Sequence, residues 1–172
     1  MDFRDKSSVE PQDSSAPFAT IESHGEAVPS LPLILAHTGV KHHSGTVHES
    51  IRDRWLRGDS AVVEGYVYIA RLARLGKKAL LANEWDTVAA LMNKNHAIQR
   101  DLGGSGQSNE ILIAAALDGG AIGAKLAGAG GGGTILALTF EPDRTIEALN
   151  AAGADSILYP APSPGLTVEI VG

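Results

Sequence analysis

The sequence predicts an α+β fold with a four-stranded, mainly antiparallel sheet of ferredoxin-like character and inserted helices. Three observations carry this prediction. Short apolar runs bounded by glycine and proline occur near both ends of the chain, a long block at 44–118 has helical periodicity, and the order is strand, strand, helices, strand, strand, helix, strand, strand. We therefore expect the extra helices to be inserted between the second and third strands of the sheet.

The first part of the chain contains a polar leader and then two candidate strands. Residues 1–16 show almost no apolar period, so we expect irregular structure there, as the remnant of a preceding domain, and a single domain over 17–172. Two apolar runs follow, FATIESHG and LPLILAHTG. Leu33–Ala36 has the pattern of a buried strand, because Pro32 is tolerated at the start of a strand and Gly39 ends the run.

The central block reads as a series of helices. Gly58 stands where a C-terminal cap would end the first helix, and Asn83 is expected to be the N-cap of the third. Trp55 and Trp85 occupy helix-stripe positions, which favours burial in the core over a role as ligand platforms. The predicted helices cover about 44–57, Val62–Leu80, the stretch from Asn83 to Leu102, and Ser108–Leu117 after a GGSG break.

The last third of the chain returns to strands. Pro142 and Gly153 bracket a helix, since proline favours the first helical position and glycine favours the position after the end. The predicted strands cover Ile122–Leu126, Thr134–Phe140, Ser156–Tyr159 and Leu166–Val171.

Composition excludes several classes of function. Twenty acidic residues against fourteen Lys and Arg give a net charge of −6, which argues against a surface that neutralises nucleic-acid phosphates. No apolar run reaches the roughly 18 residues of a membrane span, so no membrane partner is expected. The absence of cysteine excludes disulfides and thiolate chemistry, and a cytoplasmic location is the expectation.

Histidines cluster early in the chain, but their spacing does not predict a metal site. No histidine or carboxylate pair has the helical spacing of a known zinc motif. The clustered histidines are His37, His42, His43 and His48.

A glycine run is the most informative motif. The segment AKLAGAGGGGT at 124–134 is framed by two predicted strands and is too short and apolar to be a linker. Glycine reaches positive φ and lets another group approach the backbone, and consecutive N–H groups in such a turn can converge on an anion. No Lys-Ser/Thr pair follows as in a Walker A loop, and no helix follows as in a dinucleotide fingerprint. We predict a phosphate-facing turn made of Gly128, Ala129, Gly130, Gly131, Gly132 and Gly133.

KLAGAGGGG resembles the third motif of the GHMP kinases, the superfamily of galactokinase, homoserine kinase and mevalonate kinase. SGTVHESIRDRWLRGD at 44–59 looks like a helix of the plant-type glucuronokinase branch, and LMNKNHAIQRDLG at 91–103 looks like a helix common in mevalonate-kinase-like members. The resemblance implies a GHMP kinase C-terminal domain whose glycine loop helps shape the site for the ATP phosphates. It further implies ATP and Mg²⁺ as cofactors of the complete enzyme, with none bound by this chain alone.

The resemblance assigns the other catalytic parts to an N-terminal domain. The Ser-rich phosphate loop does not occur in this sequence, and we assign no catalytic residue to the chain. We therefore expect an N-terminal GHMP kinase domain as partner. The chain is expected to be a fragment, one half of a split enzyme, or a domain that has lost its catalytic part.

Candidate substrate-binding residues lie near the first helix. His43, Ser44 and His48 are expected at its start, where N–H groups favour anionic ligands. Arg52 lies four residues after His48 and can hold a carboxylate bidentately, which suits a uronic acid such as glucuronate phosphorylated at its anomeric hydroxyl. The alternative is that Arg52 and Arg54 form surface ion pairs with Glu49 and Asp53.

Two alternatives remain open for the third helix, and two for the whole chain. Asn93, Asn95 and His96 either brace the glycine loop or serve local packing. The whole chain is either the C-terminal portion of an ATP-dependent sugar kinase or a non-catalytic binding or interaction domain with the same fold.

From these assignments we expect no measurable kinase turnover from this chain alone, because phosphoryl transfer also needs a metal and an oriented nucleophile. A coupled ADP-release assay across uronic acids, hexoses and heptose phosphates checks this. Turnover that persists through purification to homogeneity contradicts it.

Overall fold

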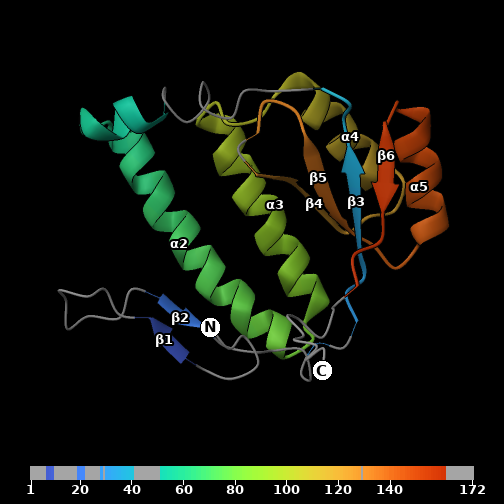
Figure 1. Ribbon diagram of the computed structural model, residues 1–172, viewed down its shortest axis with the longest axis horizontal. Coiled ribbons are helices and arrows are strands. Elements are labelled where there is room, and N and C mark those ends of the chain that lie inside the picture. Colours follow the sequence, from blue (N-terminus) through green and yellow to red (C-terminus); the bar gives the residue numbers. More distant parts are fainter. Residues whose placement is uncertain are drawn as a thin grey trace, which may run out of the picture. The chain divides into compact units, whose positions relative to one another are not determined.

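The computed structural model describes residues 7–9, 19–21, 28, 30–40, 51–128 and 130–161 (Figure 1). The chain divides into two compact units, Met1–Leu31 with Ala161–Gly172, and Pro32–Pro160. In the first unit, β1 (Ser7–Val9) pairs antiparallel with β2 (Ala19–Ile21). Strand β1 falls within the segment 1–16 for which composition predicted irregular structure. The predicted strand at 166–171 lies outside the described residues.

The second unit contains the predicted four-stranded sheet, formed by β3 (Leu33–His37), β4 (Gly123–Ala127), β5 (Thr134–Leu138) and β6 (Ser156–Leu158). The strand order is β4-β5-β3-β6, and every neighbouring pair is antiparallel. In the order of the chain this is 2-3-1-4, the ferredoxin-like arrangement, so the predicted fold class is confirmed.

The place of the inserted helices differs from the prediction. They lie between the first and second strands of this sheet, β3 and β4, rather than between the second and third. The reason is strand pairing, because β2, counted as a sheet strand from its apolar pattern, pairs with β1 instead.

Helices cover both faces of the sheet in the second unit (Figure 1). Helices α4 (Gln107–Asp118) and α5 (Pro142–Ala151) pack on one face, α3 (Trp85–Asp101) packs on the other, and α2 (Ser60–Leu81) packs on α3. Strand β5 shows why the sheet needs helices on both faces. Ile135 joins the cluster with α4 and α5, while Leu138 joins the cluster with α3. Side chains alternate along a strand, so both faces of this strand are apolar and both require a cover.

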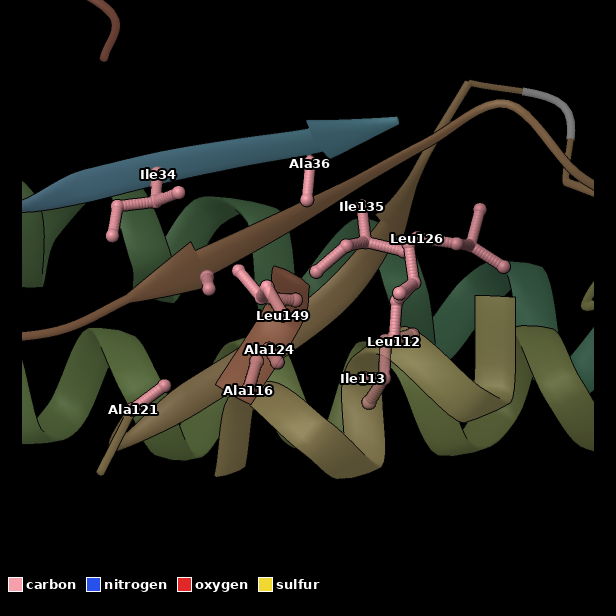
Figure 2. Close-up of a cluster of buried hydrophobic side chains, with 11 residues drawn as sticks. Ile34, Ala36, Leu112, Ile113, Ala116, Ala121, Ala124, Leu126, Ile135 and Leu149 are labelled. Carbon is pink, nitrogen blue, oxygen red and sulfur yellow. The ribbon is translucent and has the colours of Figure 1, made fainter. Parts of the chain in front are cut away.

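The larger cluster lies between the sheet and the α4–α5 layer (Figure 2). Ile34, Leu126, Ile135 and Leu149 are each no more than 1% exposed. Complete burial of a side chain of this size stabilises the fold by roughly 1.5–3 kcal/mol. This cluster therefore fixes β4 and β5, and with them the ends of the glycine run that connects the two strands.

Helix caps confirm two predictions and correct one. Gly58 ends the helical segment 51–56 with φ +74°; its N–H donates to the carbonyl of Trp55, and the N–H of Asp59 donates to the carbonyl of Arg54. Pro142 stands in the first turn of α5, and Gly153 follows the end of that helix with φ +87°.

The prediction that Asn83 is the N-cap of α3 was wrong. Asn83 instead ends α2, in the left-handed conformation with φ +56°, and the N–H of Glu84 donates to the carbonyl of Ala79. Asparagine suits both a helix start and a left-handed helix end, and only the backbone decides between the two.

Candidate functional site

The glycine loop, residues 128–133, connects β4 to β5 in the second unit. Gly128, Gly130, Gly131 and Gly133 all have left-handed φ values between +75° and +84°. Residues with a Cβ rarely adopt this conformation, so the run of glycines is a requirement of the turn rather than a sign of low complexity. Ala129 lies outside the described residues.

The loop lies directly against the backbone of a bracing segment, Gly104–Gly106, which joins α3 to α4. The N–H of Gly131 donates to the carbonyl of Gly104 at 3.1 Å. A Cβ on Gly130 would overlap that same carbonyl oxygen, and a Cβ on Gly106 would lie 2.7 Å from the carbonyl carbon and oxygen of Gly131. Glycine is therefore needed on both sides of this contact.

Two loop carbonyls are turned toward donors in the protein. The carbonyl of Gly132 accepts a hydrogen bond of 3.1 Å from Nδ2 of Asn109, and the carbonyl of Gly133 accepts one of 2.8 Å from the N–H of Thr38. No peptide bond in the described part of the chain is cis. In a trans peptide the N–H points opposite to the C=O, so the N–H of Gly133 points away from Asn109, whereas the N–H of Thr134 points away from β3 and toward its partner Ala127 on β4. An oriented N–H group such as that of Gly133 is suited to an anion.

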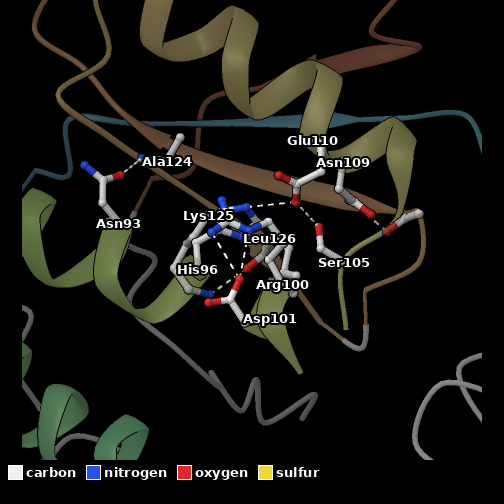
Figure 3. Close-up of polar contacts among 11 residues, drawn as sticks. Asn93, His96, Arg100, Asp101, Ser105, Asn109, Glu110, Ala124, Lys125 and Leu126 are labelled. Carbon is white, nitrogen blue, oxygen red and sulfur yellow. Dashed lines mark hydrogen bonds and ion pairs between the residues drawn. The ribbon is translucent and has the colours of Figure 1, made fainter. Parts of the chain in front are cut away.

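A buried polar cluster from α3 and α4 stands beside the bracing segment (Figure 3). Nε2 of His96 lies 3.0 Å from Oε1 of Glu110, an ion-pair distance at an angle too bent for a regular hydrogen bond. Ser105 donates its hydroxyl to the same carboxylate oxygen. Burial lowers the pKa of His96 below 6.5, and the nearby Glu110 charge opposes this without reversing it.

Asn93 of α3 binds the edge of β4, as the left side of Figure 3 shows. Its Oδ1 accepts from the N–H of Ala124 at 2.9 Å, and its Nδ2 donates to the carbonyl of Ile122 at 3.2 Å. The side-chain amide thus takes the place of a neighbouring strand at this edge. The contacts of Asn93 lie at the start of β4, away from the loop, and fit the alternative of local hydrogen bonding, whereas His96 approaches the bracing segment through Glu110. Asn95 is half-buried.

Lys125 is a basic group near the loop that the sequence analysis did not single out. It is half-buried on β4, and its Nζ donates to the carbonyl of Leu126. Burial lowers the pKa of Lys125 below 10.5. The sequence signal that could have found Lys125 was its position inside KLAGAGGGG, directly before Leu126.

Ser105, Asn109 and Glu110 were also missed by sequence reasoning. They follow Gly103 and Gly104 in the GGSGQSNE stretch, where periodicity indicates only the start of a helix. Which residues of that turn face the glycine loop depends on how α4 packs on the sheet.

Of the predicted substrate-binding residues, the structure describes Arg52. His43, Ser44 and His48 lie outside the described residues. Arg52 is exposed on the helical segment 51–56 and lines an open pocket of about 400 Å³ with Ile51, Trp55 and Tyr66. Ile51 and Tyr66 also line a small cavity of about 50 Å³ that reaches Leu126 and Gly128, so the aromatic pocket and the glycine loop adjoin.

Two predictions about this helical segment were wrong. Trp55 is 44% exposed and packs edge-on against Tyr66, although its stripe position predicted burial. Trp85, by contrast, packs against the cluster beneath α3. Arg54 pairs with Asp59 at 2.8 Å and donates to the carbonyl of Leu102 at 3.0 Å, so its partner is not Asp53.

The described part of the chain holds no group of three or more metal-ligating side chains. Within the same residues, no helix combines the length and hydropathy that crossing a bilayer requires.

Gly128→Ala and Gly130→Ala are a matched pair of variants, because both positions have φ near +84° and only Gly130 is crowded. We expect Gly128→Ala to lower the free energy of unfolding by about 1–2 kcal/mol from backbone strain alone. Gly130→Ala must also displace the Gly104 carbonyl and is expected to lose about 2 kcal/mol more. Urea unfolding followed by circular dichroism measures both values, and equal losses would contradict the close backbone contact.

Comparison with known proteins shows similarity to one kinase family over part of the chain. Residues 77–155 match the sequence model described as GHMP kinases C terminal. Probable glucuronokinase 2 of Arabidopsis thaliana is 36% identical over 103 residues, which cover 58% of this chain and 28% of that protein. Mevalonate kinase of Pyrococcus furiosus is 29% identical over 147 residues, covering 82% and 44% respectively. The chain thus spans less than half the length of these relatives.

Solved structures share the fold. L. major mevalonate kinase in complex with R-mevalonate superposes with a TM-score of 0.70 at 24% identity, covering 74% of this chain and 40% of that one. Lactococcus lactis galactokinase complexed with galactose gives a TM-score of 0.63 at 17% identity, covering 83% and 47%. These structures show the fold, and the match of residues 77–155 to the GHMP kinase C-terminal model confirms the resemblance drawn from the motifs over that part of the chain.

Proposed function

We propose that this chain is the C-terminal portion of an ATP-dependent small-molecule kinase and that its glycine loop shapes the site for the ATP phosphates. The observation that carries this proposal is the orientation of the loop peptides. Asn109 holds the carbonyl of Gly132, which directs the N–H of Gly133 the other way, and Thr38 holds the next carbonyl, that of Gly133. Electrostatic stabilisation by preorganised N–H groups is a major part of phosphoryl-transfer catalysis.

The remaining catalytic parts belong to an N-terminal GHMP kinase domain in this proposal, with residues 17–172 as the C-terminal domain and 1–16 as a leader. Magnesium neutralises charge on the phosphates, and a second group orients the acceptor hydroxyl. The described residues offer the phosphates a backbone surface and the half-buried Lys125, and they contain no cluster of metal-ligating side chains.

For the acceptor we propose a carboxylate-bearing sugar, with glucuronate phosphorylated at its anomeric hydroxyl as the first choice. Glucuronokinase 2 is the relative at 36% identity, while the mevalonate kinases cover more of the chain at lower identity. Glucuronate and mevalonate both carry a carboxylate that Arg52 can hold. A sugar ring also presents C–H groups to aromatic faces, which suits the exposed Trp55 and Tyr66 beside Arg52.

Titration of the ¹⁵N-labelled chain with MgATP, tripolyphosphate and AMP tests the phosphate role. We expect MgATP and tripolyphosphate to shift the amide signals of Gly131–Thr134 with a Kd in the range of about 1 mM, because only part of the site is present. AMP lacks the β- and γ-phosphates and is the matched control. Shifts of equal size with AMP, or none with tripolyphosphate, would favour the non-catalytic interaction domain.

Titration with acceptors uses the indole N–H signals of the two tryptophans, of which Trp85, at the start of α3, packs against the apolar cluster between α3 and the sheet and serves as internal reference. We expect glucuronate to shift the Trp55 signal and Arg52→Gln to weaken this binding about tenfold through loss of a charge-assisted contact. Arg57→Gln removes an exposed arginine at the end of the same segment and is the control. Stronger shifts with mevalonate, or equal shifts with galactose, would overturn the choice of a uronic acid.

A further inference from the structure

Two consecutive residues in the first turn of α4 reach the glycine loop by separate routes. Asn109 and Glu110 lie outside the loop and far from it in sequence. Their hydrogen bonds run to opposite sides of the contact between the bracing segment and the loop.

The first route is direct. Asn109 is 0% exposed, and its Nδ2 donates to the carbonyl of Gly132 at 3.1 Å. A carbonyl oxygen can only accept, so the nitrogen of the side-chain amide must face it. Its Oδ1 has no hydrogen-bond partner within the described part of the chain. The buried amide is therefore held in place by the loop, and it holds the loop in turn.

The second route passes through the bracing segment. Glu110 accepts the hydroxyl of Ser105, and Ser105 lies between Gly104 and Gly106, the two residues in backbone contact with Gly130 and Gly131. His96 approaches the same carboxylate oxygen from α3. Glu110 thus anchors the segment whose Gly104 carbonyl receives the N–H of Gly131.

A loop made mostly of glycine needs such anchoring from outside to keep one conformation. Glycine loses more conformational entropy on ordering than any other residue, at roughly 1–2 kcal/mol for each backbone fixed. A run of glycines therefore stays mobile unless contacts outside it fix its conformation, and mobile N–H groups are not preorganised for an anion.

We propose that Asn109 and Glu110 are positioning residues that hold the glycine loop in its phosphate-binding conformation, Asn109 through Gly132 and Glu110 through Ser105 and Gly104. That the conformation held in this way binds phosphate rests on the proposed function. The positioning itself is a property of the chain without ligand, and the two can be tested apart.

The test compares ¹⁵N spectra of the ligand-free chain with those of Asn109→Asp, Glu110→Ala and Glu110→Gln. Asn109→Asp has the same shape but places a second acceptor against the Gly132 carbonyl. Glu110→Ala removes the acceptor for Ser105, whereas Glu110→Gln keeps one oxygen for it. Glu147→Gln, on the exposed side of α5, is the matched control.

We expect Asn109→Asp and Glu110→Ala to shift and broaden the amide signals of the glycine loop while those of β3 and β6 stay in place. Glu110→Gln should restore the loop signals toward the unsubstituted chain, whereas Glu110→Met, of similar length but without an acceptor oxygen, should not, although a purely packing role would require it to do so. Loop signals that match the unsubstituted chain in all variants would overturn the proposal. So would uniform loss of all signals, since the residues would then hold the fold rather than the loop.

The histidine provides a second readout. Burial lowers the pKa of His96, and the Glu110 carboxylate raises it, while Arg100 and Lys125 lower it further. Removing the carboxylate charge in Glu110→Gln should therefore lower the His96 pKa again, seen in its imidazole ¹H–¹³C signals. An unchanged pKa would contradict the assigned contact between His96 and Glu110.

Tripolyphosphate binding by the same variants separates the positioning role from the phosphate role. If tripolyphosphate binds the unsubstituted chain, Glu110→Ala and Asn109→Asp should weaken that binding about tenfold or more, with Glu147→Gln unchanged. If tripolyphosphate does not bind but the ligand-free loop signals respond as expected, the positioning stands and the phosphate role fails. If it binds equally to all variants, the positioning role fails and the phosphate role stands.

Discussion

The close backbone contact between the bracing segment and the glycine loop is the constraint on which the candidate site depends. A Cβ has no room at Gly130, which lies against Gly104, or at Gly106, which lies against Gly131, and one hydrogen bond closes the contact. Two loops meet here, one between two helices and one between two strands, so the contact links the helical insertion to the sheet. Either loop alone is rich in glycine and lacks an internal reason to adopt one conformation.

The layers of the fold explain how this contact is held. Strands β4 and β5 are fixed by apolar clusters on both faces, which sets where the glycine run begins and ends. Helix α3 attaches to the edge of β4 through Asn93, and α4 packs on the opposite face. The segment joining α3 to α4 must therefore cross from one face of the sheet to the other beside the β4–β5 turn. That crossing brings Gly104 to Gly130.

A functional consequence follows from the same geometry. The polar groups near the loop, including His96, Lys125 and Glu110, are partly withdrawn from water, and both basic groups have a lowered pKa because of burial. Groups in such surroundings interact more strongly with a nearby charge than exposed groups do. The exposed aromatic pocket at Arg52 shares Ile51 and Tyr66 with the small cavity that reaches Gly128, so the proposed acceptor surface lies next to the proposed phosphate surface.

The sequence by itself determined the fold class, most element positions and the glycine loop, because these depend on local signals. Apolar patterns located β3 and β5, and Pro142, Gly58 and Gly153 marked helix ends, including both ends of α5, through their own backbone preferences. The motif KLAGAGGGG carried the family resemblance that the comparisons confirmed.

Tertiary structure decided what depends on which segments meet. The pairing of β2 with β1 made β3 the first strand of the sheet, and the path of the backbone made Asn83 the end of one helix instead of the start of the next. Packing left Trp55 exposed and gave Arg54 the carbonyl of Leu102 as a partner 48 positions away. Asn109 and Glu110 have an ordinary local sequence, and only the meeting of α4 with the glycine loop gave them their partners. Long-range contacts of this kind are selected by the packing of whole elements, which no local pattern records.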